Sequence, residues 1–276
     1  MNEPDPRNLL QFAQRLAGEA GDICRSRGGP GRISRKADQS VVTETDHAIQ
    51  AHIVGAIADA YPDHAVVAEE TISEGPAHED PTQARYCWVI DPLDGTRNYA
   101  VGFPCFSTAI AVLDRGEPIV GVVAEHNTHS VFSALRGGGA TLNGKVIHRG
   151  EPMDGGDVLI GVPSSKDELT VRVVQHWAGV KGIVLRNLGS TAVHLALVAG
   201  GGLGAAFCVR AKIWDIAAGA LLVTESGGLI TDPLGQPRSV FALDGDPNEN
   251  LPFLAASPDQ QGRLLESIRA VSPDNK

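Results

Sequence analysis

The stretch CWVIDPLDGTRNY, residues 87–99, joins an apolar run to two closely spaced carboxylates. The apolar residues predict a strand, and Pro92 is expected to end its ladder in a turn that Gly95 makes tight. Such a turn would aim Asp91 and Asp94 at one point, where two buried carboxylates repel each other unless a cation lies between them. Oxygen ligands favour a hard ion such as Mg²⁺. The stretch is therefore either a structural turn or a metal site.

The composition excludes several classes of protein. The 276 residues include 33 acidic and 23 basic side chains, and this formal charge of −10 argues against binding a nucleic acid polymer. No apolar run approaches the roughly 20 residues of a membrane span, and the first residues lack a secretion signal, so we expect no membrane partner and a cytoplasmic location. The four cysteines form no close pair and are expected to be reduced and mostly buried: Cys24, Cys87, Cys105 and Cys208.

Hydrophobic periodicity predicts a strand-rich first half and an alternating second half. In the first half we expect helices at 9–23 and, capped by Thr43 or Thr45, at 45–60, with strands at 65–68, 86–90, 107–113, 119–125 and 131–135 and a turn at 137–139. In the second half we expect helices at 168–178, 190–199, about 215–226 and 260–270, with strands at 158–161, 183–185 and 203–209 and near 230, 240 and 253–255. Loops are expected at 29–39, where the chain should be mobile, and at 71–83. Residues 1–152 and 153–276 are expected to form one compact unit, with a soft boundary near 150–157.

Carboxylates follow two other predicted elements as well. Glu69 and Glu70 end the strand at 65–68 and could supply another oxygen ligand. Asp215 lies where a helix is expected to begin, and capping that helix is its alternative role. The ends of strands and helices are where an α/β fold gathers a site. The Asp-x-Asp motif of haloacid dehalogenase phosphatases does not fit, because Asp91 and Asp94 are one residue further apart.

Several segments together resemble the inositol monophosphatase family of lithium-sensitive, magnesium-dependent phosphatases. Residues 91–96 match its Asp-Pro-[Leu/Ile]-Asp-Gly-Thr motif completely, and residues 97–99 and 102–104 continue in the family's manner. Residues 36–46 resemble its Lys-x-Asp…Val-Thr-x-x-Asp segment, and residues 68–70 resemble its Gly/Ser-Glu-Glu. Residues 214–219 resemble its second signature, and residues 225–228 are close to its Glu-Ala-Gly-Gly. The order and separations are similar over nearly the whole chain.

The resemblance implies an α+β fold, a layered α-β-α-β-α sandwich of the inositol monophosphatase and fructose-1,6-bisphosphatase type, usually as a homodimer. It implies two or three Mg²⁺ ions per site. The implied metal ligands are Glu70, Asp91, Asp94, Asp215 and the carbonyl of Leu93. The implied catalytic residues are Glu70 together with Asp46 and Thr96, which would orient the attacking water or take its proton. The implied substrate contacts are Asp94, Gly95, Thr96, Ser190 and Asp215, with the amides of Gly95 and Thr96 holding the phosphate.

The implied function is hydrolysis of a small phosphorylated metabolite, similar to an inositol monophosphate, by direct attack of metal-activated water. Inositol-specific relatives carry a Glu seven residues before the second-signature Asp, and Cys208 stands there in this chain, so a strict preference for myo-inositol is not expected. Arg210 and Lys212 are either solvated surface charges or contacts to a second anionic group of the substrate. Lys36 would lie on the mobile loop near the third metal.

The sequence leaves several alternative functions open. On the same fold they are 3′(2′),5′-bisphosphate nucleotidase, fructose-1,6-bisphosphatase and histidinol-phosphatase activity. The alternative of another class is a non-catalytic partner protein that binds metal or phosphate. The histidines suggest no further site: His126 and His129 are expected to be exposed rather than zinc ligands, and Ser190 with His194 lacks the elbow motif of a serine hydrolase.

Overall fold

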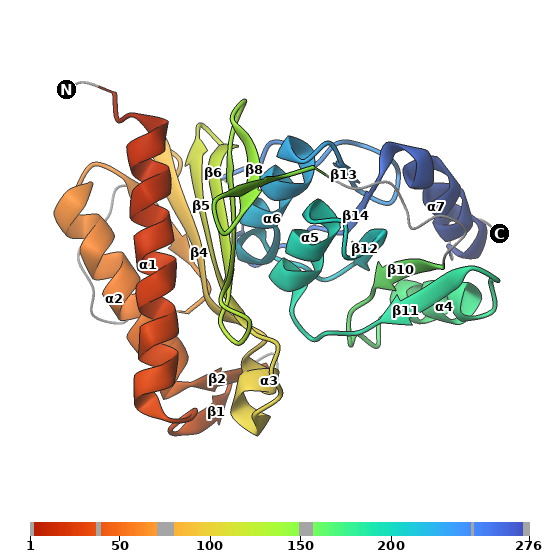
Figure 1. Cartoon of the computed structure of the whole chain (residues 1–276), viewed down its shortest axis with the longest axis horizontal. Coiled ribbons are helices and arrows are strands. Elements are labelled where there is room, and N and C mark those ends of the chain that lie inside the picture. The colour runs from red at the N-terminus through yellow and green to blue at the C-terminus, as the bar shows by residue number, and fades with distance from the viewer. Residues whose placement is uncertain (1–2, 37–39, 71–79, 149–156, 244–245, 273–276) are drawn as a thin grey trace.

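The computed structural model describes residues 3–36, 40–70, 80–148, 157–243 and 246–272. Helices and sheets alternate in five layers, as Figure 1 shows, and this confirms the predicted α+β sandwich. The boundary expected near 150–157 falls almost wholly outside the described residues, so the division at residue 152 stays a prediction. The largest core cluster contains residues of both halves, Ala109 and Leu195 among them.

The first layer is a pair of helices, α1 (Pro6–Arg27) and α2 (Glu44–Ala60). Asp5 caps α1 through a hydrogen bond from the Arg7 amide, and α1 ends at Gly28, whose φ of 65° suits a residue without a side chain. Of the two predicted caps of α2, the structure uses Thr43, in a capping box with Asp46. Both helices cover one face of a large sheet (Figure 1).

That sheet has seven strands in the order β3-β4-β5-β6-β7-β8-β9. Its first pair, β3 with β4, is parallel and every other pair is antiparallel. The strands are β3 (Ala65–Ala68), β4 (Tyr86–Asp94), β5 (Ser107–Asp114), β6 (Glu117–Glu125), β7 (Ser130–Leu135), β8 (Gly139–Leu142) and β9 (Lys145–Ile147). Strands β8 and β9 were not predicted, because they are short and alternate too little to signal a strand. The expectation that Pro92 ends its strand was wrong, since β4 continues to Asp94 across a register shift.

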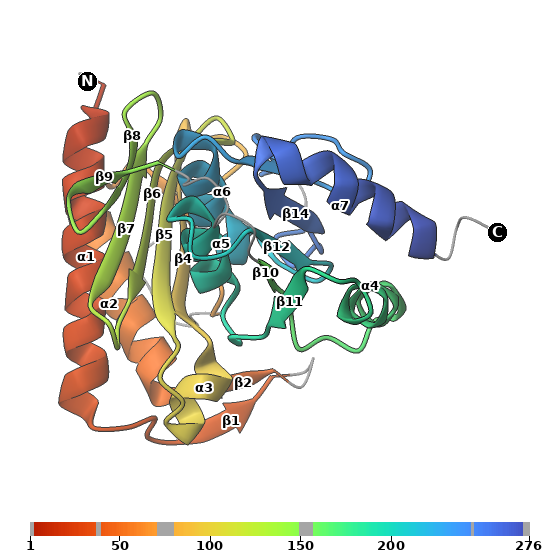
Figure 2. The same cartoon turned by 45° about the vertical axis from the view of Figure 1, so that its right-hand side comes forward.

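The middle layer is a pair of helices, α5 (Thr191–Ala199) and α6 (Ile213–Glu225), between the two sheets (Figure 2). Both are apolar on nearly all sides, as helices covered on both faces must be. Close approach of α6 to the large sheet depends on Gly121 of β6, because a Cβ atom there would lie 2.6 Å from the carbonyl oxygen of Ala218. The helix that carries Asp215 is thus held directly against the sheet that carries Asp91.

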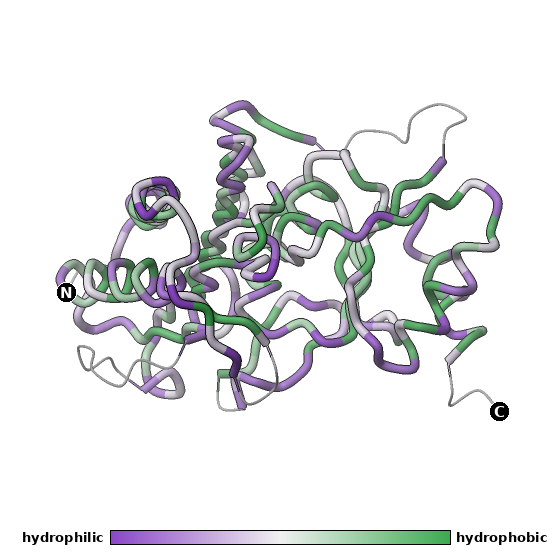
Figure 3. The backbone as a smooth tube through the Cα atoms, turned by 90° about the horizontal axis from the view of Figure 1, so that it is seen from below, coloured by the Kyte–Doolittle hydropathy of each residue, from purple (hydrophilic) through white to green (hydrophobic). Residues whose placement is uncertain are grey.

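The second sheet has five strands in the order β11-β10-β12-β14-β13. They are β10 (Val158–Gly161), β11 (Ile183–Arg186), β12 (Ala205–Cys208), β13 (Leu229–Thr231) and β14 (Phe253–Ala256), and the outer layer is formed by α4 (Glu168–Ala178) and α7 (Pro258–Val271). The strand predicted near Val240 was wrong, since the described residues there form no strand and Phe241 instead donates its amide to the Gly116 carbonyl. Hydrophilic residues are frequent at the peripheral turns (Figure 3).

Three small elements lie together at one end of the large sheet (Figure 2). The hairpin of β1 (Ile33–Arg35) and β2 (Val41–Thr43) lies beside the short helix α3 (Thr96–Val101). A loop was expected over 29–39, and the strand β1 corrects that expectation, while residues 37–39 lie outside the described part. The loop predicted at 71–83 is likewise outside it up to residue 79.

The predictions about the cysteines and about membrane-spanning helices can be compared with the described residues. All four cysteines are free thiols and buried, as predicted. None of the helices in the described ranges is long and apolar enough to cross a membrane.

We predict that Gly121→Ala lowers the free energy of unfolding by about 1–3 kcal/mol, because the new methyl group collides with backbone that cannot rotate away. Urea unfolding followed by circular dichroism measures the change. The matched control is Gly55→Ala in α2, where nothing lies within 4 Å of the new Cβ, and the expected change is a gain of up to about 1 kcal/mol. Equal effects of the two substitutions would contradict the proposed close packing of α6.

Candidate active site

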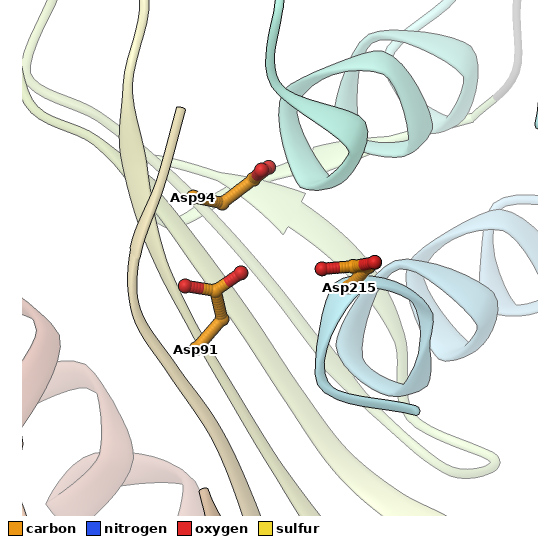
Figure 4. Close-up of side chains that lie close together, drawn as sticks. All are labelled: Asp91, Asp94 and Asp215. Carbon is orange, nitrogen blue, oxygen red and sulfur yellow. The ribbon is translucent and has the colours of Figure 1, made fainter. Parts of the chain in front are cut away.

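Three carboxylates from two layers meet at one point of the molecule. Asp91 and Asp94 belong to β4, Asp215 belongs to α6, and each offers an oxygen within 4.8 Å of the others (Figure 4). Asp91 is only 1% exposed, and the other two are half-buried. The stretch that suggested either a turn or a metal site is an irregular part of strand β4, with a register shift between Asp91 and Asp94, and it does bring both carboxylates to a third.

This irregular segment of β4 is held by specific hydrogen bonds. Asp91 accepts one from the Leu93 amide at 3.0 Å, and the Pro92 carbonyl accepts one from the Thr108 hydroxyl at 2.8 Å. Gly95 follows with a φ of 90°, and a Cβ there would lie 3.0 Å from the Cys105 carbonyl oxygen. Only glycine fits that position, which explains its place in the motif. Gly95 rather than Thr96 occupies the N-cap of α3, and Thr96 is the first residue of the helix.

The other carboxylates are fixed by the ends of the two central helices. Asp94 accepts hydrogen bonds from the Ser190 hydroxyl and from the Ala192 amide, both at 2.6 Å, at the start of α5. Asp215 accepts one from the Lys212 amide at 2.7 Å. Lys212 rather than Asp215 is the N-cap residue of α6, but Asp215, the third residue of the helix, does help to cap it by accepting from the Lys212 amide in a capping box. In both carboxylates these hydrogen bonds go to one oxygen, Oδ2.

A second acidic pair, Glu69 and Glu70, borders the cluster. The Lys36 ammonium lies 2.8 Å from Glu69 Oε1 and 2.6 Å from Glu70 Oε1. Gln50 clamps the Glu70 backbone, accepting from its amide at 2.9 Å and donating to its carbonyl at 2.5 Å. Glu70 Oε1 is buried, and the ion pair with the Lys36 ammonium is the polar interaction that the described residues give it.

Glu69 is the residue that sequence reasoning underrated. The parallel register pairs Ala68 with Ile90, and the Glu69 amide donates to the Ile90 carbonyl at 3.2 Å, so Glu69 lies beside Asp91 at the next position. Its negative charge raises the pKa of all three clustered aspartates and of Asp46. The pairing of β3 with β4 is the signal that places Glu69 next to Asp91, while Glu70 as a metal ligand stays a prediction.

Asp46 and Thr96 form a separate pair. Asp46 is fully buried, and its Oδ1 lies 3.0 Å from the Thr96 hydroxyl, which also lies 2.9 Å from the Leu93 carbonyl. The Thr43 amide donates to Asp46 Oδ2 at 2.9 Å, and the Thr43 hydroxyl donates to the same oxygen. Burial raises the pKa of Asp46, while its hydrogen bonds to Thr43 and Thr96 lower it less. The pair is therefore rigid and able to accept a proton.

Burial raises the pKa values of the clustered carboxyls, and the neighbouring negative charges add to the rise. For Asp91 and Asp215 the pKa lies well above its usual range. Burial raises the pKa of Asp94 to about 6 although hydrogen bonds at the start of α5 oppose the rise, and it raises that of Glu70 to about 7. Burial would lower the pKa of Lys36, but the charges of Glu69 and Glu70 outweigh burial and raise it. Ionised together, these carboxylates require a compensating cation.

The donor set fits a hard divalent cation. The group that the described residues bring together consists of three carboxylates, whose oxygens are ligands that Mg²⁺ and Ca²⁺ prefer, and it contains no thiol or imidazole from this part of the chain. One oxygen each of Asp91, Asp94 and Asp215 lies within 4.8 Å of the others, a grouping that could hold a metal ion. Glu69 stands beside them, and Lys36 already neutralises part of the charge of Glu69 and Glu70.

The predicted specificity residues lie in different surroundings. The Cys208 thiol in β12 is buried, and burial, with the charges of Asp215 and Asp167, raises its pKa to about 12, so it stays protonated. The Lys212 ammonium bonds the Asn248 carbonyl and, at 2.9 Å, Asn250 Oδ1. Arg210 is exposed. The expectation that His126 is exposed was wrong, because it is buried with its Nε2 2.9 Å from the Thr108 hydroxyl that supports Pro92.

The five-layer fold and the acidic cluster define a class of α+β proteins whose carboxylates could bind metal ions. The family model of the inositol monophosphatase family matches residues 5–272, and the chain belongs to that family. Nus factor SuhB of Pasteurella multocida is 35% identical over 234 residues, which cover 81% of this chain and 85% of that protein. The chloroplastic phosphatase IMPL1 of Arabidopsis thaliana is 34% identical over 250 residues, which cover 86% of this chain and 65% of that protein.

Solved structures agree with this assignment. The Thermotoga maritima IMPase has a TM-score of 0.84 and 28% identity over 98% of this chain and all of that one. The SuhB protein of Bartonella henselae has a TM-score of 0.82 and 26% identity over 95% of this chain and 98% of that one. Membership of the family and the similarity to IMPL1 support phosphatase activity.

We predict that the protein freed of divalent cations loses stability as pH rises from about 4 to 8. The folded-state pKa values of Asp94 and Glu70, about 6 and about 7, exceed those of the unfolded chain, near 4. The folded state therefore binds more protons, so the stabilisation is complete below about pH 4 and is lost as pH rises through 6 and 7. The expected loss is of order 1–3 kcal/mol.

Urea unfolding in EDTA, repeated across this pH range, measures the loss. Saturating Mg²⁺ should reverse much of it, because a ligand of the folded state alone stabilises that state. Asp94→Asn should flatten the profile in EDTA, whereas Asp59→Asn, an exposed position of α2, should not. A profile for the unmodified protein that is already flat in EDTA would contradict the repulsion between the carboxylates.

Proposed function

We propose that the protein is a Mg²⁺-dependent phosphomonoesterase that hydrolyses a small phosphorylated metabolite by direct attack of water. The observation that carries the proposal is the convergence of Asp91, Asp94 and Asp215 beside the rigid Asp46–Thr96 pair. Phosphate-monoester hydrolysis is among the slowest uncatalysed reactions, and its catalysis depends mainly on positioning and charge stabilisation. A cluster of carboxylates next to a proton acceptor meets both needs once cations are bound.

The cation site would be formed by Asp91, Asp94 and Asp215, the Leu93 carbonyl, and Glu69 or the predicted Glu70. Two or three bound Mg²⁺ ions would supply Lewis-acid stabilisation of the phosphate and of the leaving oxygen, and would turn the pocket from negative to neutral or positive. The chain itself fixes the ligands: hydrogen bonds at the starts of α5 and α6 leave Asp94 and Asp215 no freedom to rotate away.

Asp46 and Thr96 would accept the proton that the attacking water loses. The Thr96 hydroxyl donates to Asp46 and can therefore accept a proton from a water on its other side. The raised pKa of Asp46 makes it a better final acceptor than an exposed carboxylate. The amides of Gly95 and Thr96 would hold the phosphate in line with that water. The left-handed conformation of Gly95 allows the chain to approach the substrate there.

The physiological substrate stays open within this class. The alternatives on the same fold remain a 3′(2′),5′-bisphosphate nucleotide, fructose 1,6-bisphosphate and histidinol phosphate. Relatives named Nus factor SuhB keep the non-catalytic partner protein as the alternative of another class. Inhibition by Li⁺, a cytoplasmic location and a homodimer stay predictions, and light scattering of the purified chain measures the last.

We predict that the protein releases phosphate from small phosphomonoesters only when Mg²⁺ is present, and that Asp94→Asn lowers kcat/KM at least about 100-fold, the effect of removing a group that stabilises the transition state. A panel of phosphomonoesters with and without Mg²⁺ and Li⁺, read by phosphate release, measures both. Asp59→Asn on the exposed face of α2 controls for the loss of a charge. Phosphate release that survives EDTA, or near-normal rates for Asp94→Asn at saturating Mg²⁺, would refute the proposal.

We predict that Asp46→Asn and Thr96→Val each reduce kcat, and that the double variant is no slower than the slower single variant. Residues that act as one unit give non-additive losses, because removing either member abolishes the shared proton transfer. Steady-state rates of the four proteins at saturating Mg²⁺ form the double-mutant cycle. Losses that simply add would show that the two residues act separately.

A further inference from the structure

A small cavity opens next to the acidic cluster. Its volume is about 230 Å³, and it shares Ser190 with the cluster, since the Ser190 hydroxyl donates to Asp94 at 2.6 Å. Pockets for drug-sized ligands measure roughly 300–1,000 Å³, so this one suits a single substituent of a substrate whose phosphate lies at the carboxylates. The side chains and loops that form it include Arg97, Asn98, Ser164, Ser190, Thr191 and His194.

The lining of this cavity, which we call the Arg97 pocket, carries one positive charge and no negative one. Arg97 is exposed, and the described residues give its guanidinium no hydrogen bond or ion pair. His194 is buried, its Nε2 accepts the Leu188 amide at 3.1 Å, and burial lowers its pKa to about 4, so it is neutral. The guanidinium is therefore the only charge that a group entering the pocket would meet on its walls.

The walls of the pocket are fixed in place. The Asn98 side-chain amide donates to the Cys105 and Leu188 carbonyls, each at 2.7 Å, and so ties the helix of Arg97 to the loop before α5. The Ser164 hydroxyl accepts from the Asn187 side-chain amide at 2.8 Å, which leaves its own hydrogen available to donate. An arginine and a serine that line a preformed cavity offer a guanidinium and a hydroxyl donor, which match the chemistry of a carboxylate or a phosphate.

We propose that Arg97 is a specificity-determining residue that binds a second anionic group of the substrate, a carboxylate or a phosphate, in the Arg97 pocket. The inference rests on the proposed phosphomonoesterase function and names the substrate class for it: small phosphate esters that carry a further anion. It replaces Arg210 and Lys212 in that role, because the Lys212 ammonium is bonded to Asn248 and Asn250 and neither residue lines the pocket.

The test compares matched pairs of esters that differ in the second anion alone. One pair is 2-phosphoglycerate against glycerol 2-phosphate, and the other is fructose 1,6-bisphosphate against fructose 1-phosphate. The two pairs distinguish a carboxylate from a phosphate as the second group. At saturating Mg²⁺ we expect the unmodified protein to prefer the doubly anionic member of at least one pair by about tenfold in kcat/KM, the effect of a charge-assisted hydrogen bond.

Arg97→Gln keeps much of the side chain's length but removes the charge, so it should abolish that preference. The loss should fall on KM with kcat changed less than about twofold, because the second anion is bound equally in the ground and transition states. Arg263→Gln, an exposed arginine of α7, controls for the net charge and should keep the preference. Arg210→Gln tests the alternative position.

The outcomes separate this inference from the function on which it rests. A preference that persists in Arg97→Gln, that vanishes in Arg210→Gln instead, or that is absent from both pairs in the unmodified protein would overturn the role of Arg97 while leaving the phosphatase intact. No phosphate release from any ester with Mg²⁺ would overturn the proposed function, and the substrate class would fall with it.

Discussion

Repulsion among buried carboxylates is the constraint on which this structure depends. Asp91, Asp94 and Asp215 bring their oxygens within 4.8 Å of one another, and Glu69 adds a fourth negative charge beside them. Without compensation such a cluster raises the pKa of every member and opposes folding. The fold nevertheless holds each carboxylate in place with its own hydrogen bonds. Because the fold holds these carboxylates close together in spite of their mutual repulsion, we infer that a bound cation compensates their charge.

The layered arrangement of sheets and helices brings these carboxylates together. The large sheet supplies the turn at residues 91–95, and α6 delivers Asp215 from the middle layer, where Gly121 lets the helix lie directly on the sheet. The start of α5 holds Asp94 and also forms a wall of the Arg97 pocket. Under the proposed function, one helix end would serve both the reacting phosphate and the rest of the substrate, which would couple chemistry to specificity.

Much of this could be predicted from the sequence, because the motif at 91–96 specifies its own local geometry. The features that the sequence did not reveal depend on contacts between residues that are distant in the chain. The proximity of Glu69 to Asp91 required the register of β3 on β4, and the burial of His126 required its contact with Thr108. Arg97 was passed over because nothing local distinguishes it from a solvated arginine; only the cavity between α3 and α5 does.

The central claim is that the carboxylates of β4 and α6 form a divalent-cation site. The most direct measurement is a crystal structure grown with Mn²⁺ in place of Mg²⁺, with anomalous diffraction data collected at the manganese edge. The account predicts an anomalous peak within coordination distance of Asp91, Asp94 and Asp215, and loss of that peak in Asp91→Asn. Density without a manganese peak at these three residues, at Mn²⁺ concentrations that support phosphate release, would contradict it.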